Sequence, residues 1–263
     1  MHRLPEVVLR RRRLRDTPVL PPCLMAEDHV APSSPLLGNR LLDALPAEIR
    51  AALAPHFTTI DLPFEAVIHE PGAKLEHALF PTEGMISVIA AMGNGALVEI
   101  GIVGNDGMFG ISLILGDERP PQMAMVQMKG RALQIESDIL LKQVAAFPAL
   151  QKRLLRYAQA NLSSTAQSVA CNRLHLLEQR CARWLLVAHD RSPGATLHLT
   201  HELLSIMLGV RRPGVTVAAQ ALQSAGVISY NHGEINILDR QGLEAASCEC
   251  YRANTEETAR LMA

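Results

Sequence analysis

The residues most able to do chemistry are the cysteines and a group of histidines in the first half of the chain. Cysteine thiolates bind metals and exchange disulfides, and imidazole also binds metals. The five cysteines are scattered and odd in number, at Cys23, Cys171, Cys181, Cys248 and Cys250. This distribution is unlike the paired framework of a small secreted domain, and it favours a reducing cytoplasm.

Cys248 and Cys250 are the one close cysteine pair, and they could report redox state or bind a metal together with other ligands. We expect instead two ordinary thiols near a fraying C-terminus. His56, His69 and His77 have no spacing that places them on one face. The sequence therefore predicts no metal site and no cofactor.

Motifs for catalysis are weak. The glycine-rich run 101–107 has the wrong spacing for a dinucleotide-binding loop, and we expect it to lead into more strand. The sequence contains no phosphate-binding P-loop, no nucleophile elbow and no His-Glu-x-x-His motif. We expect that the protein is not an enzyme.

Polar side chains also gather around two short helices predicted near the C-terminus. Thr200 is a good N-cap for a helix over 200–207 that stops at 208–210, and Gly209 suits the left-handed turn that follows. Pro213 falls in the first turn of the next helix, about 212–224, where its missing N–H costs nothing. The flank and outer side of that helix are left with Arg211, Arg212, Gly214, Thr216, Val217 and Gln220. Short side chains there would let the helix enter a major groove.

A β-hairpin is predicted directly after these helices. Its strands, 226–230 and 234–238, flank the turn Asn231-His232-Gly233. The order helix, turn, helix, wing indicates a DNA-binding domain. Helix-turn-helix shapes also arise by chance in helical domains, so the pattern alone leaves other functions open.

Upstream, the character of the sequence changes several times. Residues 1–35 hold six arginines and six prolines, which predicts a disordered tail. We hypothesise that the native protein starts at Met25. Apolar residues at spacings of three and four over 41–53 predict a short helix, with a second segment from Pro46. Short apolar runs separated by turn residues over 58–136 predict an antiparallel sandwich or barrel.

A long helix is predicted after Pro148. Its apolar residues step by three and four through three heptads, which is typical of a coiled-coil-like seam. The expected interface positions are Leu155, Leu162, Val169 and Leu176. The seam can pack against the β domain, an identical helix or both, and an ordinary core helix is an alternative; its length and stripe favour a dimer. A second apolar stripe, 177–188, precedes a turn-rich linker at 190–194.

The C-terminal pattern resembles the winged helix of the Crp-Fnr superfamily of bacterial transcription regulators. The likeness rests on residues 200–204, 208–212, 215, 221–223, 226–228 and 235–237. It covers roughly residues 36–250, because that family places a cyclic-nucleotide-binding-like β-roll first and a long dimerisation helix second. The resemblance implies an α+β protein whose parts are a tail (1–35), an antiparallel β-roll or jelly roll (36–147), dimerisation and linking helices (148–190) and a winged helix-turn-helix (191–263).

The resemblance also implies roles for single residues. Arg212 matches the arginine that reads guanine, for which the planar guanidinium is suited, although a phosphate contact is the alternative. Thr200 matches a helix start that contacts phosphate. The expected DNA-binding residues are Thr200, Arg211, Arg212, Thr216 and Gln220. Pro213 and Val217 depart from the best-known members, which usually carry an acidic residue and a second basic reader there, so the consensus operator of those members is not expected.

The residues that bind cyclic nucleotides in this family are missing. Gly110-Ile111 stands where a Gly-Glu pair binds the ribose, and Pro120-Pro121-Gln122-Met123 stands where an Arg-Ser/Thr-Ala string holds the phosphate. Arg119 is the only nearby cation and lacks the small hydroxyl residue that should follow it. We expect no binding of cyclic AMP in the usual manner. The family's iron–sulfur sensors need a cluster of N-terminal cysteines, whereas only Cys23 lies there.

Composition is compatible with this interpretation. The 263 residues, 48% of them hydrophobic, are enough for two compact domains. The longest apolar stretch, 88–103, is too interrupted to span a bilayer. The formal net charge of −1 gives no global attraction to a polyanion, so DNA binding must rest on a local site. We expect a cytoplasmic, homodimeric transcription regulator that binds double-stranded DNA and RNA polymerase, with its effector unassigned.

Two alternatives stay open. A β-roll small-molecule or metal-binding protein, or an enzyme, with an assembly-only C-terminal domain would have an ordered pocket with convergent polar or metal-ligating groups. A purely structural dimeric adaptor would bury Arg211 and Arg212 in a protein contact.

Overall fold

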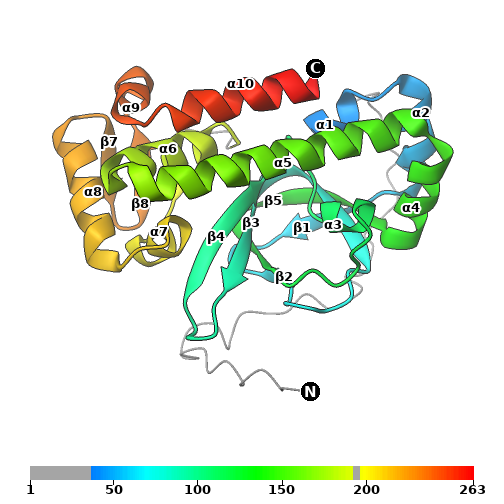
Figure 1. The fold of residues 1–263 in the computed structure, drawn as a ribbon, viewed down its shortest axis with the longest axis horizontal. Coiled ribbons are helices and arrows are strands. Elements are labelled where there is room, and N and C mark those ends of the chain that lie inside the picture. Colours follow the sequence, from blue (N-terminus) through cyan, green and yellow to red (C-terminus); the bar gives the residue numbers. More distant parts are fainter. Residues whose placement is uncertain (1–36, 192–195) are drawn as a thin grey trace.

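The computed structural model describes residues 37–191 and 196–263. Three predictions lie outside these ranges: the tail over 1–35, the hypothetical start at Met25 and most of the linker. A long helix, α5 (Pro148–Leu174), crosses the molecule, with the β-roll on one side of it and the C-terminal domain at its far end (Figure 1). None of the helices in the described ranges is long and apolar enough to cross a membrane.

The N-terminal helices are separated at Pro46, as predicted. They are α1 (Arg40–Asp43), α2 (Ala47–Leu53) and the 3₁₀ turn η1 (Ala54–His56). The residue before a proline disfavours helical geometry, which explains the break. The buried Asn39 caps α1, and its Nδ2 donates to the carbonyls of Pro81 and Gly107 at 2.8 and 2.9 Å. This side chain joins the helices to the β-roll.

Antiparallel strands form the β-roll, which confirms the predicted β domain. They are β1 (Thr58–Leu62), β2 (Val67–His69), β3 (His77–Ala91), β4 (Leu97–Val103) and β5 (Met123–Glu136). The order in the sheet is β1-β5-β3-β4, and β2 also pairs with β5. In the register, His77 opposes Glu136 and Ile86 opposes Val103. Side chains on the inner face, such as Phe80 and Ile135, are fully buried.

Two helices of the roll domain differ from the prediction. The expected strand after residue 107 is wrong, because α3 (Ile111–Ile114) follows instead. Gly110 has a φ of 103°, a left-handed conformation that turns the chain out of its extended path. α4 (Ser137–Ala146), which the sequence analysis did not anticipate, follows β5 and packs against α5.

The long helix ends earlier than the apolar seam predicts. α5 stops at Leu174, and α6 (Leu177–His189) begins three residues later. His175 and Leu176 between them have ψ values of 149° and 150°, an extended backbone that breaks the helix. Leu176 is therefore the N-cap of α6 and not a position on the long helix, which corrects its placement on the seam.

The C-terminal domain contains the predicted helix, turn, helix and wing. Its elements are β6 (Thr196–His198), α7 (His201–Leu208), α8 (Arg212–Ser224), β7 (Ile228–Asn231) and β8 (Glu234–Ile237). β6, which was not predicted from the sequence, completes a sheet in the order β6-β8-β7. Cys181 and Leu185 of α6 are buried in the same core as Val215 of α8. We therefore propose that this domain begins with α6 and not at residue 191.

Two further helices follow the wing, α9 (Arg240–Ala246) and α10 (Cys250–Met262). α10 runs back along α5 (Figure 1), and its Asn254 Nδ2 donates to Ser164 Oγ of α5 at 3.3 Å. The expectation of a fraying C-terminus is wrong. Because this helix packs against α5, Cys248 and Cys250 are only 3% and 0% exposed.

Candidate nucleic-acid interface

The turn between α7 and α8 sets the direction of the second helix. Thr200 Oγ1 accepts a hydrogen bond from the Leu203 N–H at 3.2 Å and so caps α7. Gly209 adopts a φ of 63°, which a residue with a side chain rarely takes. α8 then begins at Arg212, with Arg211 as its N-cap and a proline in its first turn. The local signals expected from the sequence are thus confirmed.

α8 has one buried and one exposed face. The buried side packs Val215, Ala218, Ala219 and Leu222 into the domain core. On the other side, Arg211, Arg212, Val217 and Gln220 are exposed. Within the described part of the chain, neither Arg211 nor Arg212 makes a side-chain hydrogen bond or ion pair. The two guanidinium groups therefore stand free beside the positive end of a helix, a favourable place for an anion.

Thr216 is placed differently from the other expected DNA-binding residues. It is half-buried, and its hydroxyl lies 3.1 Å from His201 Nδ1 and 3.2 Å from the Arg212 carbonyl. The His201 ring in turn stacks on Tyr230 of the wing, with ring centroids 4.3 Å apart. Burial, and then the nearby Arg212 charge, lower the pKa of His201. Thr216 therefore links α8 to α7 and the wing.

Exposed apolar side chains line the outer face of α5. Leu155, Leu162 and Val169 are 43%, 64% and 68% exposed, whereas Leu150 and Leu154 on the opposite face are fully buried. Leu176, just beyond the helix, is 72% exposed. Exposed apolar residues at a spacing of seven along a helix are typical of a coiled-coil interface. We call these four exposed residues the α5 ridge.

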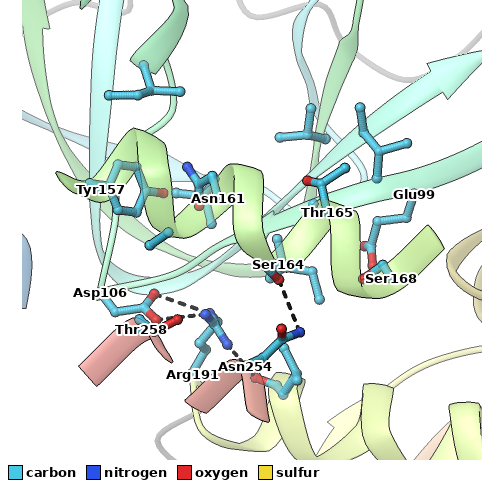
Figure 2. Close-up of a pocket in the computed structure, with 18 of the residues that line it drawn as sticks. Glu99, Asp106, Tyr157, Asn161, Ser164, Thr165, Ser168, Arg191, Asn254 and Thr258 are labelled. Carbon is cyan, nitrogen blue, oxygen red and sulfur yellow. Dashed lines mark hydrogen bonds and ion pairs between the residues drawn. The ribbon is translucent and has the colours of Figure 1, made fainter. Parts of the chain in front are cut away.

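A cavity of about 830 Å³ lies between the β-roll, α5 and α10. Figure 2 shows polar residues of α5 and α10 facing it together with charged residues of the roll and of the end of α6. The charged groups are already paired within the chain. Arg191 contacts Asp106 at 2.7 Å, and Glu99 accepts hydrogen bonds from Trp184 Nε1 at 2.6 Å and Ser87 Oγ at 2.5 Å.

Glu99 is the most perturbed acid in this region. Its carboxyl group is enclosed between β4 and α6, and this burial raises its pKa to about 7, despite the two hydrogen bonds that favour the charged form. Ile111 and Pro120, which the resemblance implies are at the positions of the family's ribose and phosphate ligands, also line the cavity. Arg119 is exposed and donates to the Gly72 carbonyl at 3.2 Å.

The structure also brings together residues that the sequence analysis did not connect. Cys171 and His175 at the end of α5 meet Cys248 and Cys250. The available signal was the i, i+4 spacing of Cys171 and His175, which places two potential metal ligands on one side of a helix. By contrast, the ring of His69 lies against Phe109, with centroids 5.7 Å apart.

Comparison with known proteins gives consistent results. Residues 179–246 match the family model of the Crp-like helix-turn-helix domain. The chain is 25% identical over 180 residues to the transcriptional regulator SdrP of Thermus thermophilus, a match that covers 66% of this chain and 85% of that protein.

Two solved structures illustrate the shared fold. FixK2 from Bradyrhizobium japonicum has a TM-score of 0.59 at 15% identity, over 73% of this chain and 98% of that one. A transcriptional regulator of the CRP/FNR family from Thermus thermophilus has a TM-score of 0.54 at 25% identity, over 72% and 97% of the two chains.

The family match falls on the helices that carry the two free arginines, and the shared fold extends over the β-roll and the long helix. The chain is therefore a DNA-binding transcriptional regulator that carries a Crp-like helix-turn-helix domain and shares the fold of Crp-Fnr regulators.

Proposed function

We propose that two copies of this chain pair along α5 and bind one near-palindromic DNA site. The α5 ridge supports the pairing, because a single chain leaves it exposed to water. A two-fold axis between the α5 helices would place the two α8 helices about one DNA turn apart, roughly 34 Å. The free guanidinium groups of Arg211 and Arg212 carry the proposal, since they are exposed where a groove-binding helix begins.

Each expected DNA-binding residue has a specific proposed role. Arg212 reads guanine through O6 and N7, a contact worth about 1–3 kcal/mol of discrimination. Arg211 contacts phosphate. Thr200 does so as well, because its oxygen accepts from Leu203 while its own hydrogen is free to donate. Gln220 lies further along the exposed face and contacts the groove there, whereas Thr216 holds α8 in place through His201.

The cavity beneath α5 is the proposed effector site. The small-molecule-binding alternative predicts an ordered pocket with convergent polar groups, and polar groups converge on this cavity. Ile111 and Pro120 cannot hold a ribose and a cyclic phosphate, so the effector is not cyclic AMP bound in the usual manner. An effector there would shift the population between two settings of the DNA-binding domains. The protein catalyses no reaction and acts in the cytoplasm with RNA polymerase.

The structural-adaptor alternative is not favoured by the position of the arginines. That alternative needs Arg211 and Arg212 buried in a protein contact, and both are exposed in this chain. The adaptor alternative also does not explain why a β-hairpin wing follows the polar exposed face of α8.

Selection from a randomised duplex DNA pool tests this proposal. Wild-type protein should enrich a two-fold symmetric sequence, and Arg212→Ala should relax the preference at one base pair in each half-site. Arg252→Ala, which removes an exposed arginine of α10, is the control and should select the wild-type site. If wild-type protein enriches no sequence with or without cell extract, the proposal fails, and a role confined to the β-roll cavity replaces it.

A further inference from the structure

Four potential metal ligands meet where α5 ends. Cys171 lies in the last turn of α5, and His175 follows the helix directly. Cys248 precedes α10, and Cys250 is the first residue of that helix. Each contributes one atom, a sulfur or an imidazole nitrogen, and all four atoms lie within 4.8 Å of one another. Cys171 Sγ and Cys248 Sγ are 3.5 Å apart, and Cys250 Sγ is also 3.5 Å from His175 Nδ1.

These separations match a tetrahedral site for one ion. Zinc lies about 2.3 Å from cysteine sulfur and about 2.0–2.1 Å from histidine nitrogen. Tetrahedral angles then separate two sulfurs by about 3.8 Å, and a sulfur from a nitrogen by about 3.5 Å. Three thiolates and one imidazole form one of the common donor sets of structural zinc sites.

A disulfide explains the arrangement less well. The sulfur–sulfur bond is about 2.05 Å long, which is far shorter than the observed 3.5 Å between Cys171 and Cys248. A disulfide between these two would also leave unexplained why Cys250 and His175 point to the same place.

The three thiols of the site are closed to solvent, and His175 is half-buried. Cys171, Cys248 and Cys250 are 0%, 3% and 0% exposed, and they form a small buried cluster separate from both large hydrophobic cores. Four protein ligands without an open position are typical of a structural zinc site and not of a catalytic one.

The surroundings complete the coordination chemistry. With Nδ1 of His175 facing Cys250, the other ring nitrogen, Nε2, lies 3.2 Å from Glu249 Oε1. Metal-bound histidines usually donate their second N–H to such a carboxylate, which fixes the ring and its tautomer. Gln167 Nε2 donates to Cys250 Sγ at 3.1 Å.

Positive charge also approaches the cluster from α6. Arg180 and Arg183 both lie near enough to interact electrostatically with Cys171. The Nε atoms of both arginines are buried and have no hydrogen-bond partner within the described residues. Three thiolates around a divalent ion carry a net negative charge, which these two guanidinium groups would offset.

We propose that Cys171, His175, Cys248 and Cys250 hold one Zn²⁺ ion in a closed Cys₃His site. The ion would join the end of α5 and the connection that follows it to the start of α10. It would thereby fix the setting of the DNA-binding domain relative to α5. This consequence for DNA binding rests on the proposed function, whereas the metal site itself does not.

Metal analysis of the full chain tests the site. The protein is purified under reducing conditions, and unbound metal ions are removed by dialysis. We expect about one zinc per chain in wild type, as a single four-ligand site requires. Cys248→Ser and His175→Ala should lose it, while Cys181→Ala, a buried cysteine outside the cluster, should keep it. Cobalt(II) added to zinc-free wild-type protein should give the intense visible absorption of tetrahedral thiolate coordination, and zinc should abolish it.

A ligand variant can also fail to fold, so Glu249→Gln provides a second comparison. It keeps all four ligands and should weaken zinc affinity by about 10–100-fold in competition with a chelator, with unchanged circular dichroism. The proposal is overturned if reduced wild-type protein binds neither zinc nor cobalt(II), or if Cys248→Ser retains as much zinc as wild type.

DNA binding separates this proposal from the previous one. Removal of zinc should change affinity for the selected DNA site by at least about fivefold, the lower range of typical coupling between sites, while Arg212→Ala should keep its zinc. Zinc-loaded protein that selects no DNA sequence would refute the proposed function and leave the metal site intact. Zinc bound at one ion per chain, with the same DNA affinity after its removal, would confirm the site and refute its coupling to DNA.

Discussion

The charged residues of α8 and those beneath α5 differ in whether the chain itself satisfies them. Arg191 and Glu99 are enclosed and paired with Asp106, Trp184 and Ser87. Arg211 and Arg212 are exposed and have no side-chain partner within the described residues. The paired charges hold the roll against α6 and the residues that follow it, whereas the free charges are available to an outside anion. This contrast is the reason for proposing that α8 binds DNA while the enclosed pairs hold the fold together.

The largest expected effect on DNA affinity comes from separating the two α8 helices of the proposed dimer. Leu162→Glu places a charge on the α5 ridge, where burying it against a second α5 is costly. In a dimer, binding of one DNA-binding domain raises the effective concentration of the other at its half-site. Without the dimer, DNA affinity should fall by about 100-fold or more. Sedimentation should show a monomer, and the free energy of unfolding of that monomer should be unchanged. Leu115→Glu, an equally exposed leucine of the roll, should leave dimer and affinity intact; a dimeric Leu162→Glu protein would refute pairing along α5.

The enclosed charges beneath α5 should instead affect how the free energy of unfolding depends on pH. The pKa of Glu99 is about 7 in the folded protein against 4.5 as the reference value. A raised folded pKa means that this group stabilises the fold fully below about pH 4.5, and that the stabilisation is lost as pH rises to about 7. The full difference is roughly 3 kcal/mol.

Urea unfolding of wild type and Glu99→Gln at pH 5 and pH 7.5 measures this difference. The amide cannot ionise, so the variant should lose less stability than wild type between the two pH values. Parallel pH profiles for the two proteins would show that Glu99 stays ionised and that its environment is more polar than the structure indicates.

A smaller effect distinguishes the supporting and reading residues within α8 itself. Thr216→Val removes the hydroxyl beside His201 and should lower the free energy of unfolding by about 1 kcal/mol, with the DNA preference unchanged. Gln220→Ala removes an exposed side chain and should leave stability within about 0.5 kcal/mol while weakening DNA binding. Denaturation and DNA titration of both variants measure these effects. A change of the preferred DNA sequence in Thr216→Val would reverse the two assignments.

The parts of the fold predicted from sequence are those with local causes. The N-cap at Thr200, the left-handed Gly209 and the proline in the first turn of α8 each act on their immediate neighbours, and the structure confirms all three. The roll strands were likewise indicated by turn residues, although the short helix after Gly110 was not.

The parts that could not be predicted depend on distant contacts. Cys171 and Cys248 are 77 residues apart and meet only because α10 packs back along α5. No periodicity in either segment encodes that return. The break at Leu176 was missed for a related reason, since the apolar stripe continues past the point where the backbone becomes extended.

The most direct test of the central claim is a double-mutant cycle between Arg212 and DNA. Affinities of wild type and Arg212→Ala would be measured for the selected site and for the same site with the predicted guanine pair exchanged. We predict that wild type loses about 1–3 kcal/mol per half-site on the base exchange, and that Arg212→Ala loses almost nothing further. An equal loss for both proteins would contradict base reading by α8 and leave Arg212 with at most a phosphate contact.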